Sequence, residues 1–375
     1  MGKNYLMTPG PTPVPEDIRL EMAKPIIHHR TKEYQAIFKD VTEGLKKIFK
    51  TSNDIYTFTS SGTGAMEASI VNVLSPGDKI IVVRGGKFGE RFGDIAKAYG
   101  VEVIPIDVEW GRAPKLEVIK DTLKKNPGVK GVYTTLCETS TATVYDIKAI
   151  GEVVKARDAL FVVDTISGLG ADDFENDKWG VDIAVCGSQK GLMIPPGLAF
   201  CSVSEKAWKA AENSKLPKFY FNFKKYKKAW LDTDTPFTSA ITLVIGLKKA
   251  IEKINKQGID NVIAEHQAQA AAFRGACEAM GLELFSKSPS SAVTGVLTPA
   301  GMDSDGLIKL LKAEFGVTFA GGQEHLKGKI FRCAHMGGID KEHTIESIKA
   351  LEQALVKLGH KFKAGSGIEA AKRIL

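Results

Sequence analysis

Short apolar runs alternate with longer amphipathic segments over the first half of the chain. Apolar runs typical of buried strands lie at residues 55–59, 79–83, 102–106, 131–135, 160–164, 182–186 and 198–203. Segments with helical periodicity lie at 32–50, 64–74, 89–99, 115–125 and 146–157. This alternation predicts an α/β fold, with a mostly parallel sheet and helices on both of its faces.

The pattern changes after about residue 235. Helical periodicity covers 241–254 and 259–280, and shorter strands at 295–299 and 329–334 are accompanied by helices at 304–315 and 341–358. This favours a smaller α+β domain at the C-terminus. The proline-rich segment 8–15 (TPGPTPVP) excludes helix and central strand and predicts an extended arm. We therefore expect an arm over 1–20, a large domain over 21–260 and a small C-terminal domain over 261–375.

Composition excludes several classes of protein. The net charge of +7 is scattered, except in 218–230 (KFYFNFKKYKKAW), where lysines and aromatic residues interleave. A nucleic-acid patch is one interpretation of that segment; we favour a helix or loop with solvated lysines and buried aromatic rings. Five widely spaced cysteines form no metal-binding cluster and suit a reducing cytoplasm. We find no apolar run long enough to span a membrane and no signal-peptide core, so we expect a cytoplasmic protein.

Two charged residues follow buried strands. Asp164 ends the strand 160–164, and Lys190 lies just beyond 182–186, between small residues. In open α/β sheets, ligands bind at the carboxyl ends of the strands. A lysine there can form a Schiff base if burial lowers its pKa, and a partly buried carboxylate needs a cation or several donors. The alternatives are a loop lysine that pairs with a carboxylate, and an aspartate that caps a helix or forms a structural ion pair.

A glycine-containing loop, SSGTGAMEA at 60–68, follows the strand 55–59. It leads into a helix whose free N–H groups suit a phosphate. Glu67 stands where a dinucleotide fingerprint has its third glycine, and the next strand ends in Arg84 rather than an acidic residue. The loop therefore indicates a phosphate site or a plain tight turn rather than an NAD site. A phosphate site, a carboxylate and a lysine together are what a pyridine-ring cofactor requires.

Three further segments contribute candidates at strand ends or in strands. Phe88 follows the strand 79–83 and is placed either to stack on a flat ring or to pack in the core. CETSTA (137–142) offers hydroxyl groups or forms a polar turn. Arg332 lies in the apolar strand 329–334, where it binds either a substrate carboxylate or a buried acidic side chain.

Taken together, these motifs resemble those of a known family. The segments TPGPTP, SGTGAxEA, ETST, VVDTISGLG, SQKG and PPG are similar, in order and over essentially the whole chain, to those of class V aminotransferases. These are fold-type-I enzymes that use pyridoxal 5'-phosphate (PLP). The branch that the chain resembles most is the alanine–glyoxylate and serine–pyruvate aminotransferases.

The resemblance implies a role for each matching position. Lys190 would form the Schiff base with PLP and move the substrate's α-proton, and Asp164 would pair with the pyridine nitrogen. Arg332 would bind the substrate carboxylate, with help from the backbone of Gly10. The remaining cofactor contacts would come from Thr63, Gly64, Ala65, Phe88, Thr139, Ile166 and Gln189, and, for the partner subunit's phosphate, from Thr238 and Thr235.

The implied reaction is ping-pong transamination between alanine or serine and a small 2-oxo acid, glyoxylate or pyruvate, in a homodimer with shared active sites. No second arginine suited to a dicarboxylate is evident. Alternatives are a phosphonate aminotransferase, a cysteine desulfurase, a hydrogenase-associated subunit and an NAD-dependent dehydrogenase. For His28, His29 and Arg30 we favour a structural role over one at the substrate entrance.

Overall fold

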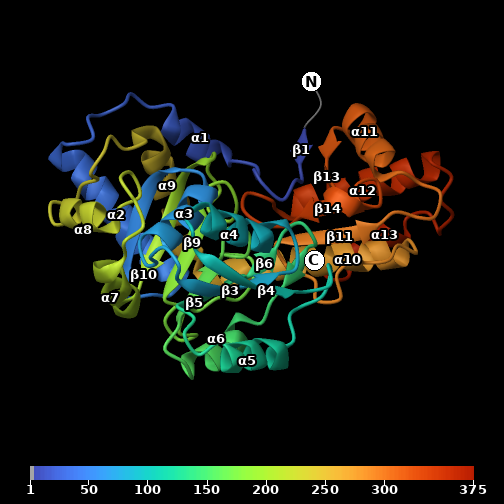
Figure 1. Cartoon of the computed structure of the whole chain (residues 1–375). Coiled ribbons are helices and arrows are strands. Elements are labelled where there is room, and N and C mark those ends of the chain that lie inside the picture. The colour runs from blue at the N-terminus through green and yellow to red at the C-terminus, as the bar shows by residue number, and fades with distance from the viewer. Residues whose placement is uncertain (1–3) are drawn as a thin grey trace.

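The computed structural model describes residues 4–375 and contains one large sheet flanked by helices, followed by a smaller C-terminal part (Figure 1). The large sheet has seven strands, in the spatial order β2 (Asp54–Ser60), β10 (Gly197–Val203), β9 (Ile183–Gly187), β8 (Leu160–Asp164), β5 (Gly131–Thr135), β3 (Lys79–Arg84) and β4 (Glu102–Asp107). Only β10 runs antiparallel to its neighbours; the other six strands share one direction. The prediction of a mostly parallel α/β sheet is confirmed.

Both faces of this sheet are buried, because alternate side chains of each strand enter different cores. In β3, Ile81 and Val83 pack into one cluster, and Ile80 and Val82 into the other. The first cluster also takes side chains from α2 (Lys32–Phe49), α5 (Leu116–Lys125), α6 (Ile147–Lys155) and α9 (Ile241–Gln257). The second takes them from α3 (Gly62–Val71), α4 (Lys87–Ala98), α7 (Glu205–Asn213) and α8 (Phe223–Trp230). Successive side chains of a strand point to opposite faces of the sheet. Because both faces are buried, nearly every position is apolar and the strands appear in the sequence as continuous apolar runs.

The C-terminal part is built on a three-stranded antiparallel sheet, in the order β11 (Val293–Leu297), β14 (Ile330–Ala334) and β13 (Ala320–Gly321). Its core includes side chains of α10 (Ile259–Ala279), α11 (Ser304–Phe315), α12 (Lys341–Lys357) and α13 (Ser366–Lys372). A short 3-10 helix, η1 (Glu324–Leu326), follows β13. The division of the chain at residue 260 stays a prediction, since α10 sends Val262 into the first cluster and Phe273 into this third one.

The segment before α1 (Glu16–Met22) runs between the two parts of the molecule. Its strand β1 (Tyr5–Leu6) pairs with β12 (Val317–Thr318), and Met7 is buried in the C-terminal core. Further on, Thr12 N–H donates to the Gln189 carbonyl of the large sheet's loop. This arm bends at residues 8–11, enters α1 at Glu16, and is bonded to both parts; the predicted arm over 1–20 stays a prediction.

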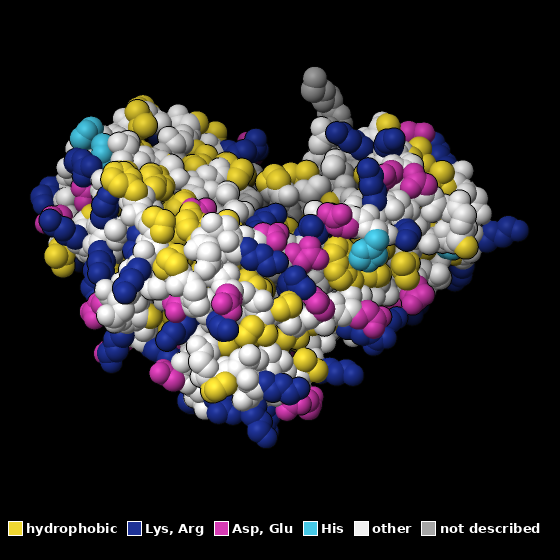
Figure 2. Space-filling model, in the orientation of Figure 1, with side chains coloured by type: hydrophobic (Ala, Val, Ile, Leu, Met, Phe, Trp, Pro, Cys, Tyr) yellow, Lys and Arg dark blue, Asp and Glu magenta, His cyan; other side chains and the backbone are white. Residues whose placement is uncertain are grey.

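The lysine- and aromatic-rich segment forms α8 and the turn before it. Phe223 and Tyr226 are buried and Lys224, Lys227 and Lys228 are exposed, as the favoured interpretation expects. Lys218 and Phe219 differ from it, since Lys218 is partly buried and Phe219 is 71% exposed. On the face shown in Figure 2, Lys and Arg side chains are scattered among acidic ones over both parts of the molecule. Within residues 4–375, no helix is long and apolar enough to cross a membrane, and no group of His, Cys, Asp and Glu could hold a metal ion.

Candidate active site

Five parallel strands end at one edge of the large sheet, and the segments that follow them carry most of the predicted site residues. The segment 62–65 (GTGA) follows β2, Phe88 follows β3, and Thr139 follows β5 in the short hairpin of β6 (Cys137–Glu138) and β7 (Thr143–Val144). Asp164 is the last residue of β8, and Lys190 lies three residues beyond β9. The strand order thus brings together residues that lie far apart in the sequence.

Lys190 is buried without a carboxylate partner. Its Nζ donates to the carbonyl of Pro9 in the arm and to Ser167 Oγ, at 3.1 Å. Burial lowers the pKa of Lys190 to about 8. Gly10 crosses directly over this side chain, because a Cβ on Gly10 would lie 2.4 Å from Lys190 Cε. The alternative of a loop lysine paired with a carboxylate does not describe this residue.

Asp164 is buried as well, and its carboxylate accepts a hydrogen bond from the backbone N–H of Ile166, at 2.8 Å. Burial raises the pKa of this carboxyl to about 7, although Lys190 and Arg91 act in the opposite direction. No ion pair to Asp164 is found in the described part of the chain, and it caps no helix. The fold therefore keeps an acidic group at the sheet edge without compensating its charge.

The loop after β2 becomes the first turn of α3. Ser61, the N-cap residue, makes no side-chain cap bond, and the Gly64 N–H donates to the Ser61 carbonyl at 2.9 Å, so the N–H groups before Gly64 are those left for a ligand. Gly64 is required by packing, since a Cβ there would lie 1.9 Å from Ser60 Oγ. Beside this turn, the buried Gln189 Oε1 has no hydrogen-bond partner. Thr63 Oγ1 is contacted at 3.1 Å by Arg91 Nη1.

Phe88 and Ile166 are apolar side chains of this edge. The half-buried Phe88 ring lies under the guanidinium of Arg91, 4.9 Å from its centroid. Ile166 packs against Gly62, where an added Cβ would lie 2.6 Å from Ile166 Cδ1. Ala65 is fully buried in the second core cluster.

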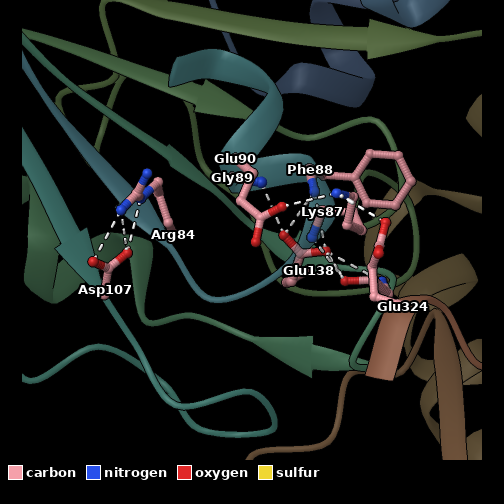
Figure 3. Close-up of polar contacts among 9 residues, drawn as sticks. Arg84, Lys87, Phe88, Gly89, Glu90, Asp107, Glu138 and Glu324 are labelled. Atoms are coloured by element: carbon pink, nitrogen blue, oxygen red, sulfur yellow. Dashed lines mark hydrogen bonds and ion pairs between the residues drawn. The ribbon is translucent and has the colours of Figure 1, made fainter. Parts of the chain in front are cut away.

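A buried carboxylate, that of Glu138, fixes the turn that carries Phe88. It accepts hydrogen bonds from the backbone N–H groups of Phe88 and Gly89, at 3.1 and 2.9 Å, and from Ser140 (Figure 3). An acidic group at the N-terminus of α4 is favoured by the free N–H groups and the helix dipole. In the same view, Lys87 bridges to Glu324 of η1, at 3.1 Å, which joins α4 to the C-terminal part.

Arg332 reaches this edge from β14. Its Nε and Nη2 donate to the Gly321 carbonyl, at 3.0 and 2.8 Å, and its Nη1 donates to the Thr139 carbonyl, at 2.8 Å. Burial lowers the pKa of Arg332 to about 10. All of its partners in the described chain are carbonyls rather than carboxylates, so the alternative of a buried salt bridge is not observed. A guanidinium has five N–H groups, which leaves two of them for an anion.

Two predicted residues lie apart from this group within a single chain. Thr238 is exposed, and Thr235 Oγ1 donates to the Phe237 carbonyl of its own loop. This loop is held by the Arg30–Asp234 ion pair and by a hydrogen bond between the hydroxyls of Tyr34 and Ser239. Arg30 therefore supports the threonine loop, whereas the structural role favoured for His28 and His29 stays a prediction.

The sequence interpretation missed four groups that contact the predicted residues: Ser167, Arg91, Glu138 and the Pro9 carbonyl. Arg91 lies one helical turn after Phe88, a spacing that places both side chains on one face of a helix. Ser167 lies three residues after Asp164, within a turn that gives no periodic signal.

Comparison with known proteins places the chain in a family. Residues 5–338 match the family model for aminotransferase class V. A curated relative from Anabaena cylindrica, named soluble hydrogenase 42 kDa subunit, is 42% identical, with 99% of this chain and 98% of that protein covered. The serine–glyoxylate aminotransferase of Methylorubrum extorquens is 35% identical, with 100% and 96% covered. Among solved structures, the ureidoglycine–glyoxylate aminotransferase of Bacillus subtilis superposes with a TM-score of 0.95, at 29% identity, with 100% of this chain and 98% of that chain covered.

The large sheet, with a lysine and an aspartate at the ends of its strands, is that of a fold-type-I aminotransferase, and the matches agree. The chain belongs to the class V aminotransferases, a family of PLP-dependent enzymes, as the resemblance implied.

Proposed function

We propose that this protein binds PLP at the edge described above and transfers an amino group between a small L-amino acid and glyoxylate or pyruvate. The observation that carries the proposal is Lys190, a buried amine with no acidic partner, at the same sheet edge as the uncompensated Asp164. When bound, PLP would supply an aldehyde for an amine and a ring that withdraws electrons from the substrate's α-carbon.

The residues present fit this cofactor. The Asp164 carboxylate matches a protonated ring nitrogen, and Phe88 and Ile166 provide apolar surfaces for the two faces of a flat ring. For the phosphate, the first turn of α3 offers N–H groups, Thr63 a hydroxyl, and Gln189 an amide that can donate through Nε2. The Gln189 Oε1, which has no partner in the described chain, is an acceptor and suits a donor group of a ligand rather than the phosphate itself.

The chain's own groups account for binding and proton transfer. Arg332 holds the substrate carboxylate through its two free N–H groups, and its carbonyl partners fix the orientation of the guanidinium. Lys190 Nζ removes the proton from the substrate's α-carbon and returns it. Because burial lowers the pKa of Lys190 to about 8, roughly a tenth of the amine is neutral at pH 7, and the neutral form is the one that can accept a proton.

Glyoxylate is favoured as the amino acceptor because both the Methylorubrum extorquens and Bacillus subtilis relatives are named for it, although their amino donors differ. For the donor we propose alanine or serine. Arg91, the other arginine at this edge, donates to Thr63 Oγ1 and lies over the Phe88 ring, so we assign it to the cofactor-binding residues rather than to a second substrate carboxylate.

We further propose a homodimer in which Thr238, and less directly Thr235, reach the partner subunit's cofactor phosphate. Thr238 is exposed in the single chain, yet its loop is rigidly tied to the 28–34 segment. An exposed, well-anchored hydroxyl is suited to an intersubunit contact.

The name of the Anabaena cylindrica relative raises a second candidate, a subunit of a hydrogenase assembly. Within the described residues no metal-binding group is found, and all five cysteines are buried. A complete lysine, aspartate and arginine set has no purpose in a purely structural subunit, so we favour catalysis. The burial of Cys333 in β14 also argues against a desulfurase, which needs a thiol on a mobile loop.

Reconstitution with PLP tests the proposed function. We expect the wild-type protein to gain a visible absorbance band that borohydride abolishes, and to convert alanine or serine when glyoxylate is supplied. Lys190→Ala should lose the band and at least a thousandfold in kcat, on the order expected when a general base and covalent anchor are both removed. Lys218→Ala, which removes another partly buried lysine, should retain both. Absence of the band in the wild type, or an active Lys190→Ala variant, would contradict the proposal.

A further inference from the structure

A continuous chain of buried polar contacts joins Lys190 to Arg332. Lys190 Nζ donates to Ser167 Oγ at 3.1 Å, Ser167 Oγ bonds to Thr139 Oγ1, and the Thr139 carbonyl accepts from Arg332 Nη1 at 2.8 Å. All four side chains are buried, with Ser167 only 4% exposed. The contacts therefore link the proposed proton-transfer group to the proposed carboxylate-binding group.

The chemistry of these groups fixes the direction of the hydrogen bonds. A protonated lysine has three N–H donors and no acceptor, so Ser167 must accept from it and direct its own hydrogen toward Thr139. When the amine is neutral it gains one acceptor site, and the hydroxyl pair can reverse. The Pro9 carbonyl can accept from the amine in either state, whereas Ser167 can also donate to the lone pair of the neutral amine without moving.

We propose that Ser167 is a positioning residue, which together with the Pro9 carbonyl holds the amine of Lys190 whenever that amine is free. This inference rests on the proposed function. No acidic side chain in the described chain takes this role, and Gly10 leaves the space in which the lysine side chain reaches both partners.

The proposal predicts how Ser167 affects protonation. A hydroxyl that accepts from an ammonium stabilises the charged form, and its removal favours the neutral amine. In Ser167→Ala the pKa of Lys190 should therefore fall below that of the wild type. Thr139→Val should also lower the pKa of Lys190, but by less. In this variant Ser167 still accepts from Lys190 and loses only its hydrogen bond to Thr139, which polarises its hydroxyl.

The experiment is recombination of the cofactor-free protein with PLP, followed by the rise of the visible band at a series of pH values. Because PLP titrates identically in every reaction, a shift in the midpoint of the rate profile belongs to the protein. We expect Ser167→Ala to lower the midpoint by about one pH unit. Ser167→Thr keeps the hydroxyl, so its midpoint should lie within about a quarter of a pH unit of the wild-type midpoint.

Ser202→Ala is the matched control, since Ser202 is an equally buried serine whose hydroxyl bonds to Asn176 Oδ1 rather than to Lys190. It should leave the midpoint unchanged. If the wild type recombines with PLP normally and the Ser167→Ala midpoint is unshifted, the positioning role of Ser167 is wrong and the proposed function is unaffected. If Ser167→Ala does not fold, the same criterion applies to Thr139→Val. Failure of the wild type to recombine would overturn the proposed function instead.

Discussion

Three ionisable side chains at the sheet edge are held out of water without an opposite charge in contact. Burial lowers the pKa of Lys190 to about 8 and that of Arg332 to about 10, and raises the pKa of Asp164 to about 7. Each shift favours the neutral form and records a free-energy cost of folding. Such uncompensated groups are typical of sites completed by a charged ligand.

Asp164→Asn should therefore stabilise the cofactor-free protein. The pKa of Asp164 rises from 3.8 when unfolded to about 7 when folded, so its penalty is absent below about pH 4, grows up to about pH 7 and is constant above. A pKa difference of about three units corresponds to roughly 4 kcal/mol. Above about pH 7, the free energy of unfolding of the variant should therefore exceed that of the wild type by up to this amount. Chemical unfolding at pH 4 and pH 8 measures the difference.

With PLP present, the same substitution should act in the opposite sense, because an amide cannot supply a negative charge to the ring nitrogen. Asp164→Asn should bind PLP at least tenfold more weakly, as measured by equilibrium titration. Equal or weaker stability of the cofactor-free variant at pH 8 would contradict the buried-charge argument.

The sequence predicted the residues whose positions follow from strand ends, and missed those that depend on the path of the loops. Lys190 and Asp164 stand directly beyond apolar runs, so the carboxyl-end rule located them. Arg91 looks like an ordinary polar residue of an amphipathic helix, and Ser167 is one of several small residues in a turn. Arg91 contacts Thr63 because α4 lies beside the first turn of α3, and Ser167 contacts Thr139 because the turn after β8 meets the β6–β7 hairpin.

At the scale of elements, the predicted ranges agree closely with the structure where apolar runs are bounded by glycine or charged residues. The strands 131–135 and 160–164 and the helix 304–315 match residue for residue. Short elements were missed, such as α7 and α13, because few buried side chains define their period. The antiparallel direction of β10 had a signal: the connection from β9 contains no helix, and a parallel crossover usually requires one.

The first turn of α4 depends on Glu138, and this dependence can be tested. Glu138→Gln keeps the shape of the side chain but replaces one acceptor oxygen with a donor, so an N–H of Phe88, Gly89 or Ser140 must lose its partner. We expect a loss of about 1–3 kcal/mol in unfolding free energy and weaker PLP binding, because Phe88 is displaced.

Thermal unfolding and cofactor titration measure these two effects. Glu117→Gln is a suitable control, since Glu117 lies in the first turn of α5 and is exposed. Removing the charge of Glu117 should change the free energy of unfolding by less than about 0.5 kcal/mol. A Glu138→Gln variant as stable as this control would show that the buried carboxylate is not needed for the turn.

At the scale of the whole molecule, the site draws on both parts of the chain and, in the proposed dimer, on a second subunit. The large sheet supplies Lys190 and Asp164, β14 supplies Arg332, and the Lys87–Glu324 ion pair joins the two parts near Phe88. The intersubunit contribution cannot be derived from one sequence or one chain, since the exposed Thr238 has no contact that reveals its partner.

Subunit hybridisation tests the shared site. Lys190→Ala and Thr238→Glu homodimers should each be inactive, the second because its added charge repels the partner's cofactor phosphate. Random mixing makes half of the dimers hybrid, and each hybrid has one intact site, so about a quarter of wild-type activity should return. Sedimentation of differently tagged subunits verifies exchange. No recovery after verified exchange would place Thr238 outside the partner's site.

The arm gives the molecule a particular order of assembly during translation. Its residues leave the ribosome first, but Met7 exchanges hydrogen bonds with Thr318 and Ala334, which are made near the end of synthesis. At ribosomal rates that interval is on the order of tens of seconds. Until Ala334 has emerged, the arm beside Lys190 is bonded only to the large sheet's loop, through Thr12, Gln189 and Lys190. The lysine therefore gains its complete cover only near the end of synthesis, when both attachments of the arm exist.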